Sequence, residues 1–133
     1  MKKVVIISVI LLSCASACTK NSLSISTHDL TGTWVLKNIS GGFAGGNTTP
    51  TDRITISFET NSRYISTMND TITATGKYTL TKAPQPNYYY SETVLNLLSD
   101  SDQTTYGISL QNDSLVLAQP CCDQFQFLYT KLK

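Results

Sequence analysis

Charged residues are scarce in this sequence. Asp, Glu, Lys and Arg make up 14% of the 133 residues, and the formal net charge at pH 7 is +1. Proteins that bind nucleic acids present clusters of Lys and Arg to the phosphates. The chain has no run of basic residues and no cluster in which basic and aromatic residues alternate. We therefore expect no nucleic-acid partner.

Histidine is nearly absent, because His28 is the only one. His28 precedes the predicted domain, so it cannot be the histidine of a nucleophile-histidine-acid triad within it. No strand face carries the paired carboxylates that general acid-base catalysis often uses. We interpret His28 as a solvent-facing residue or a local cap. Asp100 and Asp102 lack the remaining ligands of a Ca²⁺ loop and fit a solvated turn better. The sequence predicts no catalytic residue, no metal site and no cofactor, so we do not expect an enzyme.

Long apolar runs are missing except near the N-terminus. Lys2 and Lys3 precede residues 4–12, which are apolar apart from Ser8. This run is too short for a transmembrane helix, which needs about 20 residues. Residues 1–17 are typical of a secretory signal peptide.

The end of this leader resembles a bacterial lipobox, with small residues before a cysteine. We prefer Cys18 as the lipidated residue, because the three residues before it are all small. Cys14 is the second choice, since it has a favourable Leu three positions before it but a bulky Leu beside Ser13. A third alternative is ordinary cleavage after Ala17, which would leave an exposed thiol.

Lipidation would place this protein in a membrane without a transmembrane helix. Each methylene of an acyl chain such as palmitate on Cys18 would strengthen membrane binding by about 0.8 kcal/mol when it is buried in the bilayer. We predict an exported lipoprotein on the bacterial outer membrane, on its periplasmic or surface face. Residues 18–29 would be the lipidated cysteine and a polar tether, followed by one domain over residues 30–133.

The domain alternates apolar and polar residues with the period of a β-strand. Trp34 and Leu36 share a face of the first segment, and we expect both to point inward. No helix is expected. The predicted strands are residues 32–40, 54–58, 64–68, 72–80, 93–98, 106–110, 115–117 and 125–130.

Short connections between these strands favour an up-and-down antiparallel order. Eight strands can close into a barrel that is just wide enough to be filled by side chains or to hold one small ligand. Closure also removes the exposed strand edges. We therefore predict a single all-β domain, an eight-stranded antiparallel up-and-down barrel, with Trp34 over Lys131 where the first and last strands pair.

Residues 41–52 contain four Gly and one Pro, a composition that disfavours any regular element. Phe43 lies in this segment. It would serve as a lid or plug over one end of the barrel, or it would pack against the core as part of a mobile connection.

Four segments resemble the small lipocalin-like domains of lipoproteins from Bacteroidota. They are Gly-Thr-Trp at 32–34, Ile-Ser-Gly-Gly-Phe-Ala-Gly-Gly at 39–46, Gly-Lys-Tyr-Thr-Leu-Thr-Lys at 76–82, and Cys-Cys-Asp at 121–123 before an aromatic last strand. Gly-Thr-Trp also resembles the Gly-x-Trp motif of lipocalins.

The resemblance implies a barrel that binds a ligand in a calyx. In lipocalins the Trp closes one end of the barrel beneath an Arg from the last strand. The only Arg residues here are Arg53 and Arg63, and the last strand offers Lys131 instead. A Lys can also stack on an indole ring, with less bidentate hydrogen bonding than an Arg.

Two functions fit these observations. The first is binding of a small hydrophobic ligand within the barrel; the second is an anchored scaffold or protein-interaction module with a filled barrel and an unknown protein partner. The second would use Tyr88, Tyr89 and Tyr90 as a contact surface. The predicted calyx residues are Trp34, Leu36, Phe58, Tyr64, Tyr78, Tyr106, Phe127 and Tyr129, with Ile56 and Phe125 as further candidates.

Cys121 and Cys122 are adjacent, which is chemically unusual. In an exported protein they could form a disulfide with each other, remain thiols or pair elsewhere. Metal binding is disfavoured, because a tetrahedral site needs four ligands and only Asp123 is near.

Overall fold

The computed structural model describes residues 25–89, 91–120 and 124–133. The candidate cysteines (14, 18, 121 and 122) and Tyr90 lie outside these ranges. The elements are α1 (Thr27–Leu30), β1 (Gly32–Gly41), β2 (Gly46–Thr48), β3 (Ile54–Phe58), β4 (Arg63–Met68), β5 (Thr71–Lys82), α2 (Pro86–Tyr89), β6 (Thr93–Leu98), β7 (Gln103–Gln111), β8 (Ser114–Ala118) and β9 (Phe125–Lys131).

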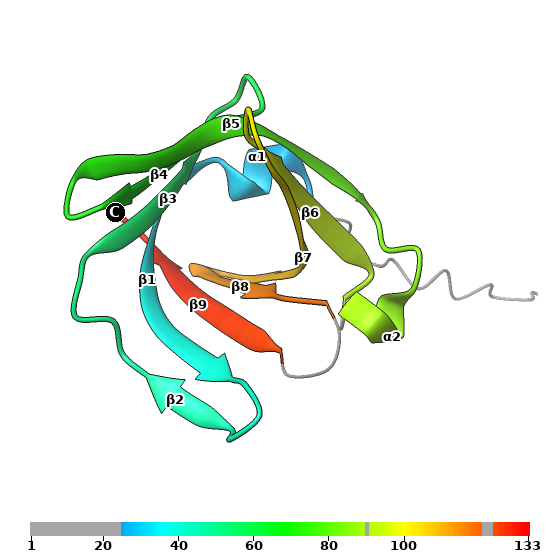
Figure 1. Cartoon of the computed structure of the whole chain (residues 1–133). Coiled ribbons are helices and arrows are strands. Elements are labelled where there is room, and N and C mark those ends of the chain that lie inside the picture. Colours follow the sequence, from blue (N-terminus) through cyan, green and yellow to red (C-terminus); the bar gives the residue numbers. More distant parts are fainter. Residues whose placement is uncertain (1–24, 90, 121–123) are drawn as a thin grey trace, which may run out of the picture.

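Eight of these strands close into an antiparallel barrel (Figure 1). Each of β3 to β8 pairs with the next strand along the chain, and β1 pairs with both β3 and β9. In the β1–β9 register Trp34 lies opposite Lys131 and Leu36 lies opposite Tyr129. The predicted closure of the barrel by its first and last strands is confirmed.

The strand β2 is an addition that we did not predict. It pairs with the end of β1, with Gly41 opposite Gly46, and Figure 1 shows the resulting hairpin projecting away from the barrel. Its turn is possible because Gly42 and Gly45 adopt φ angles of +77° and +64°, which glycine tolerates best. Phe43 at the tip is 95% exposed, so it neither plugs the barrel nor packs on the core. Both predictions for Phe43 were wrong.

The chain before β1 also differs from the prediction. Residues 27–29, expected to end a tether, belong to α1. Ser26 caps this helix, and its side chain and backbone both hydrogen-bond with Asp29 in a capping box. Leu30 is fully buried, so it anchors α1 to the core of the domain, while the rest of the helix is exposed (Figure 1). We expected no helix, because a single turn leaves no 3.6-residue period in the sequence.

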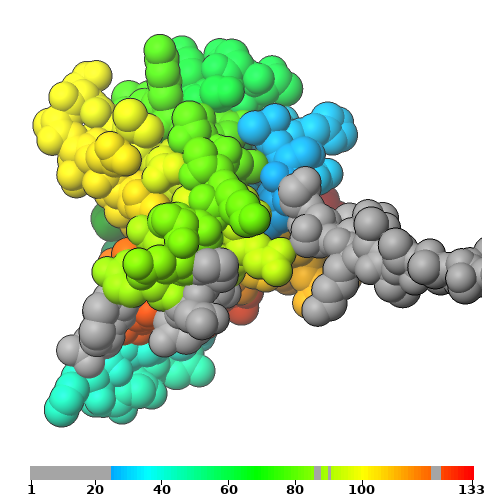
Figure 2. All heavy atoms as spheres, turned by 90° about the vertical axis from the view of Figure 1, so that its right-hand side faces the viewer, coloured from blue at the N-terminus to red at the C-terminus, as the bar shows by residue number. Residues whose placement is uncertain are grey.

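The short helix α2 was missed for the same reason. It lies in the β5–β6 connection, on the side of the molecule that faces the viewer in Figure 2. Its Tyr89 carbonyl crosses the outer side of β7 at Gly107, where an added Cβ would lie 1.9 Å from that oxygen. Gly107 therefore permits α2 to cover this part of the barrel.

The tight turns follow the sequence closely. Asn69, Asp70 and Asn112 have positive φ angles of 51°, 65° and 52°, and they lie in the short connections between the strands predicted at 64–68 and 72–80 and at 106–110 and 115–117. Side-chain alternation fails at two strand ends. Ile72 is 62% exposed because the β4–β5 register shifts beyond Ser66, and Phe125 is 42% exposed where β9 meets the β1–β2 hairpin.

Candidate functional site

One part of the barrel interior is tightly packed around Trp34. The indole Nε1 donates a hydrogen bond of 2.8 Å to the carbonyl oxygen of Leu30 in α1. The rings of Phe58 and Tyr78 meet edge to face at 5.0 Å, and the Tyr78 hydroxyl donates to the Glu59 carbonyl at 3.1 Å. These polar groups have partners within the protein, so this region is a packed base of the barrel.

The Gly-Thr-Trp segment explains how the base is closed. The Lys131 Nζ lies 5.1 Å from the centroid of the Trp34 ring, which is a cation–π contact. The Lys131 side chain reaches the ring by passing over Gly32, where an added Cβ would lie 2.9 Å from Lys131 Cε. Gly32 also has φ of +127°. Lys131 thus occupies the position for which the lipocalin resemblance implied an Arg.

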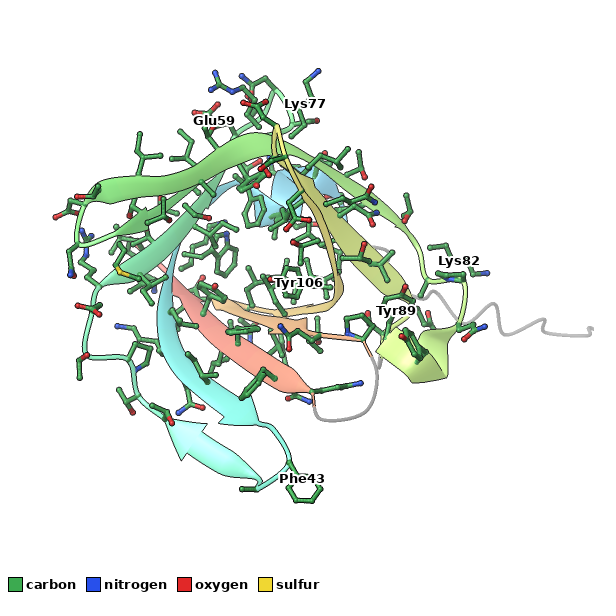
Figure 3. The ribbon with its side chains drawn as sticks, in the orientation of Figure 1. Phe43, Glu59, Lys77, Lys82, Tyr89 and Tyr106 are labelled. Carbon is green, nitrogen blue, oxygen red and sulfur yellow. The ribbon has the colours of Figure 1, made fainter. Side chains whose placement is uncertain are left out.

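Further aromatic residues of the same core adjoin this base, since Tyr64 is the register partner of Phe58. We call Tyr64 from β4, Tyr106 from β7 and Tyr129 from β9 the tyrosine cluster; Tyr64 and Tyr129 are 4% and 9% exposed. The Tyr106 ring meets Phe127 edge to face at 6.1 Å. Figure 3 shows Tyr106 inside the barrel.

The three tyrosines influence one another's ionisation. Burial raises the pKa of Tyr129, and the charge of an ionised Tyr106 raises that pKa further. The pKa of Tyr106 is raised by burial, then by Tyr64 and by the Asp102 carboxylate. Burial and then Asp102 also raise the pKa of Tyr64, while the Ser99 hydroxyl lowers it. The cluster is therefore neutral at physiological pH, and its hydroxyls can donate hydrogen bonds.

Two of these hydroxyls lack partners within the described part of the chain. Its hydrogen bonds include the Tyr78 hydroxyl of the base but neither the Tyr106 nor the Tyr129 hydroxyl. Among the described residues, the buried side-chain atom without a partner is Thr130 Oγ1, so these two tyrosine hydroxyls are not sealed from solvent. A hydroxyl without a protein partner binds water or a ligand instead.

The predicted calyx residues belong to one continuous core. Its buried members include Trp34, Leu36, Phe58, Tyr64, Tyr78 and Tyr129, and Tyr106 and Phe127 pack against it. Ile56 is buried in the same core, and Phe125 lies at the rim.

The structure adds features that the sequence did not reveal. Asp102 was interpreted as a turn residue, and its carbonyl does accept the Ser99 N–H at 2.9 Å. Its carboxylate nevertheless raises the pKa of Tyr106 on the following strand and of Tyr64 on the distant strand β4. A hollow of about 450 Å³ also lies where β4, β5 and β6 meet, lined in part by Arg63 and Lys77. Only strand pairing brings these residues together.

Outside the barrel, the aromatic residues of α2 are partly exposed. Tyr88 is 41% exposed and meets Tyr89 edge to face at 5.1 Å. Among the described helices, none has the length and apolar character needed to cross a membrane.

Comparisons with known protein families, with curated proteins and with solved structures found no match for this chain. The functional interpretation therefore rests on the geometry of the barrel.

Proposed function

We propose that the barrel binds a small, mainly apolar molecule beside the tyrosine cluster. The observation that carries this proposal is the pair of hydroxyls on Tyr106 and Tyr129, which make no hydrogen bond with a described residue and are not sealed from solvent. A ligand with a carbonyl, ether or hydroxyl oxygen would accept these hydrogen bonds. Phe127 and Leu36 would contact its apolar part.

The Asp102 carboxylate influences which ligand charge this site favours. It raises the pKa of Tyr64 and Tyr106, because its negative charge opposes a second one on these residues. The same repulsion would disfavour an anionic group beside the cluster. We therefore expect a neutral ligand.

A lipid on Cys18 would hold this barrel at the outer membrane. The described chain begins at Ile25, so residues 19–24 would join the lipid to the barrel over roughly 20 Å. Replacing Cys18 with Ala and following palmitate labelling tests this part of the proposal. Loss of labelling supports Cys18, whereas continued labelling would assign the lipid to Cys14.

Native mass spectrometry of the full chain, purified from its membrane in a mild non-ionic detergent, tests ligand binding. We expect a bound small molecule in the wild-type protein. Replacing Tyr106 and Tyr129 together with Phe keeps both rings and removes both hydroxyls, and should weaken retention about tenfold, since each hydrogen bond contributes about 0.5–1.5 kcal/mol. Tyr88→Phe on α2 is the matched control and should retain the molecule.

The experiment also has results that contradict the proposal. Equal retention by the wild type and the Tyr106→Phe/Tyr129→Phe variant would remove the tyrosine cluster from the site. Absence of any bound molecule from natively purified protein would favour the second candidate, an anchored interaction module. The exposed Tyr88 beside Tyr89 is the observation that favours that candidate.

A further inference from the structure

The corner hollow, as we call the 450 Å³ depression near Arg63, lies on the outside of the barrel. It forms where β5 changes partners. Residues up to Lys77 pair with β4, and residues from Lys77 onward pair with β6. Lys77 therefore has Arg63 on one neighbouring strand and Leu98 on the other. The volume falls within the range of about 300–1,000 Å³ typical of small-molecule sites.

Gly76 shapes this corner. An added Cβ would lie 1.9 Å from the Leu98 carbonyl oxygen and 2.9 Å from a ring carbon of Tyr64. The missing side chain allows the end of β6 to lie directly against β5. This close approach brings Leu98 and Asp100 to the same hollow as Arg63 and Lys77.

The two cations of the hollow are unusual neighbours. Like charges directly opposite each other in a sheet are destabilising, yet Arg63 and Lys77 are register partners and both are exposed. The salt bridges between described residues involve neither of them. Asp100 is the one carboxylate in the lining, so the hollow has a net charge of +1.

Acidic groups near the hollow limit how much negative charge a favoured ligand can carry. Glu59 lies in the turn before β4, where its N–H donates to the Arg63 carbonyl at 2.8 Å, and Figure 3 shows Glu59 and Lys77 at the same edge of the barrel. Glu59 does not line the hollow. With Asp100 inside and Glu59 at the edge, a monoanion is better matched than a dianion. Leu98 is 40% exposed and offers an apolar contact.

We propose that the corner hollow binds a small organic monocarboxylate. Its carboxylate would accept hydrogen bonds from the Arg63 guanidinium and the Lys77 ammonium, an arrangement for which the planar guanidinium is well suited. Its apolar part would pack on Leu98. This site is separate from the barrel interior, so it stands or falls independently of the proposed ligand site there.

Nuclear magnetic resonance titration of the full chain with benzoate tests the proposal. We expect chemical-shift changes at the Gly76, Lys77 and Leu98 amides that saturate. Benzyl alcohol, which has a similar shape and no charge, should bind at least about tenfold more weakly. Inorganic phosphate, which has no apolar part, should also bind more weakly than benzoate.

Charge variants assign the binding to named residues. Arg63→Gln with Lys77→Gln should weaken benzoate binding about tenfold, whereas Lys82→Gln, an exposed lysine at the far end of β5, should leave it unchanged. Asp100→Asn should strengthen binding a few-fold, because it removes the carboxylate from the lining. This increase is the result that a merely structural role for these side chains would not give.

The proposal would be overturned by equal binding of benzyl alcohol and benzoate, by unchanged benzoate binding in the Arg63→Gln/Lys77→Gln variant, or by shifts confined to the tyrosine cluster. Phosphate binding as tight as that of benzoate would also overturn it, since the hollow would then be a site for inorganic anions. All the exchanged side chains are exposed, and circular dichroism would verify that each variant is folded.

Discussion

Gly76 is a position at which a very small change should have a large effect on this barrel. In Gly76→Ala the new methyl group would lie 1.9 Å from the Leu98 carbonyl oxygen, well inside van der Waals contact. The opposing atom is backbone, so no side-chain rotation relieves the clash. Either β6 moves away from β5, or the corner distorts and displaces Tyr64. Overpacking typically costs about 1–3 kcal/mol, and we expect the upper end.

The assay is urea denaturation followed by fluorescence, because Trp34 is the only tryptophan and is fully buried. A loss of about 3 kcal/mol should also lower the melting temperature by roughly 12 °C in a domain of this size. Gly46→Ala is the matched control. A Cβ there meets its nearest atom, the Gly41 carbonyl oxygen, at 3.8 Å, so its free energy of unfolding should change by less than about 0.5 kcal/mol. Equal stability of the Gly76→Ala variant and the wild type would refute the close strand contact at this corner.

Four further predictions concern other parts of the domain. Trp34→Phe leaves the Leu30 carbonyl without its donor and leaves space at the base, so urea denaturation should show a loss of about 3 kcal/mol; an unchanged midpoint would argue against the α1 contact. The raised tyrosine pKa values mean that unfolded tyrosines, with a pKa near 10, ionise first, so stability should be complete below pH 10 and fall above it; Tyr129→Phe should make that fall shallower in urea titrations between pH 8 and 11. Hydrogen bonds from Ser26 lower the pKa of Asp29 below 3.8, so its contribution should be present above that pH and lost below it; Asp29→Asn should therefore differ from the wild type near pH 6 but not in strong acid. Phe43→Ser should leave the melting temperature unchanged, because Phe43 is 95% exposed, and a clear decrease would place this ring against the core.

Much of the tyrosine cluster could be predicted from the sequence, but not its organisation. The alternation of apolar and polar residues identified Tyr64, Tyr106 and Tyr129 as inward-facing, because each strand has one face in the core and one face in solvent. It did not separate them from Trp34, Phe58 and Tyr78, since depth along the barrel depends on how far each strand is shifted relative to its neighbours. The unpaired hydroxyls became apparent only once the interior was assembled.

The sequence by itself determined the strands, their tight turns and the pairing of the first strand with the last. Period-two alternation fixes which residues face inward, and residues such as Asn69 and Asn112 fix where the chain reverses. Tertiary structure alone decided the α1 contact with Trp34, the projecting β1–β2 hairpin and the meeting of Arg63, Lys77 and Leu98. These features depend on contacts between residues distant in sequence, which a local pattern of residues does not identify.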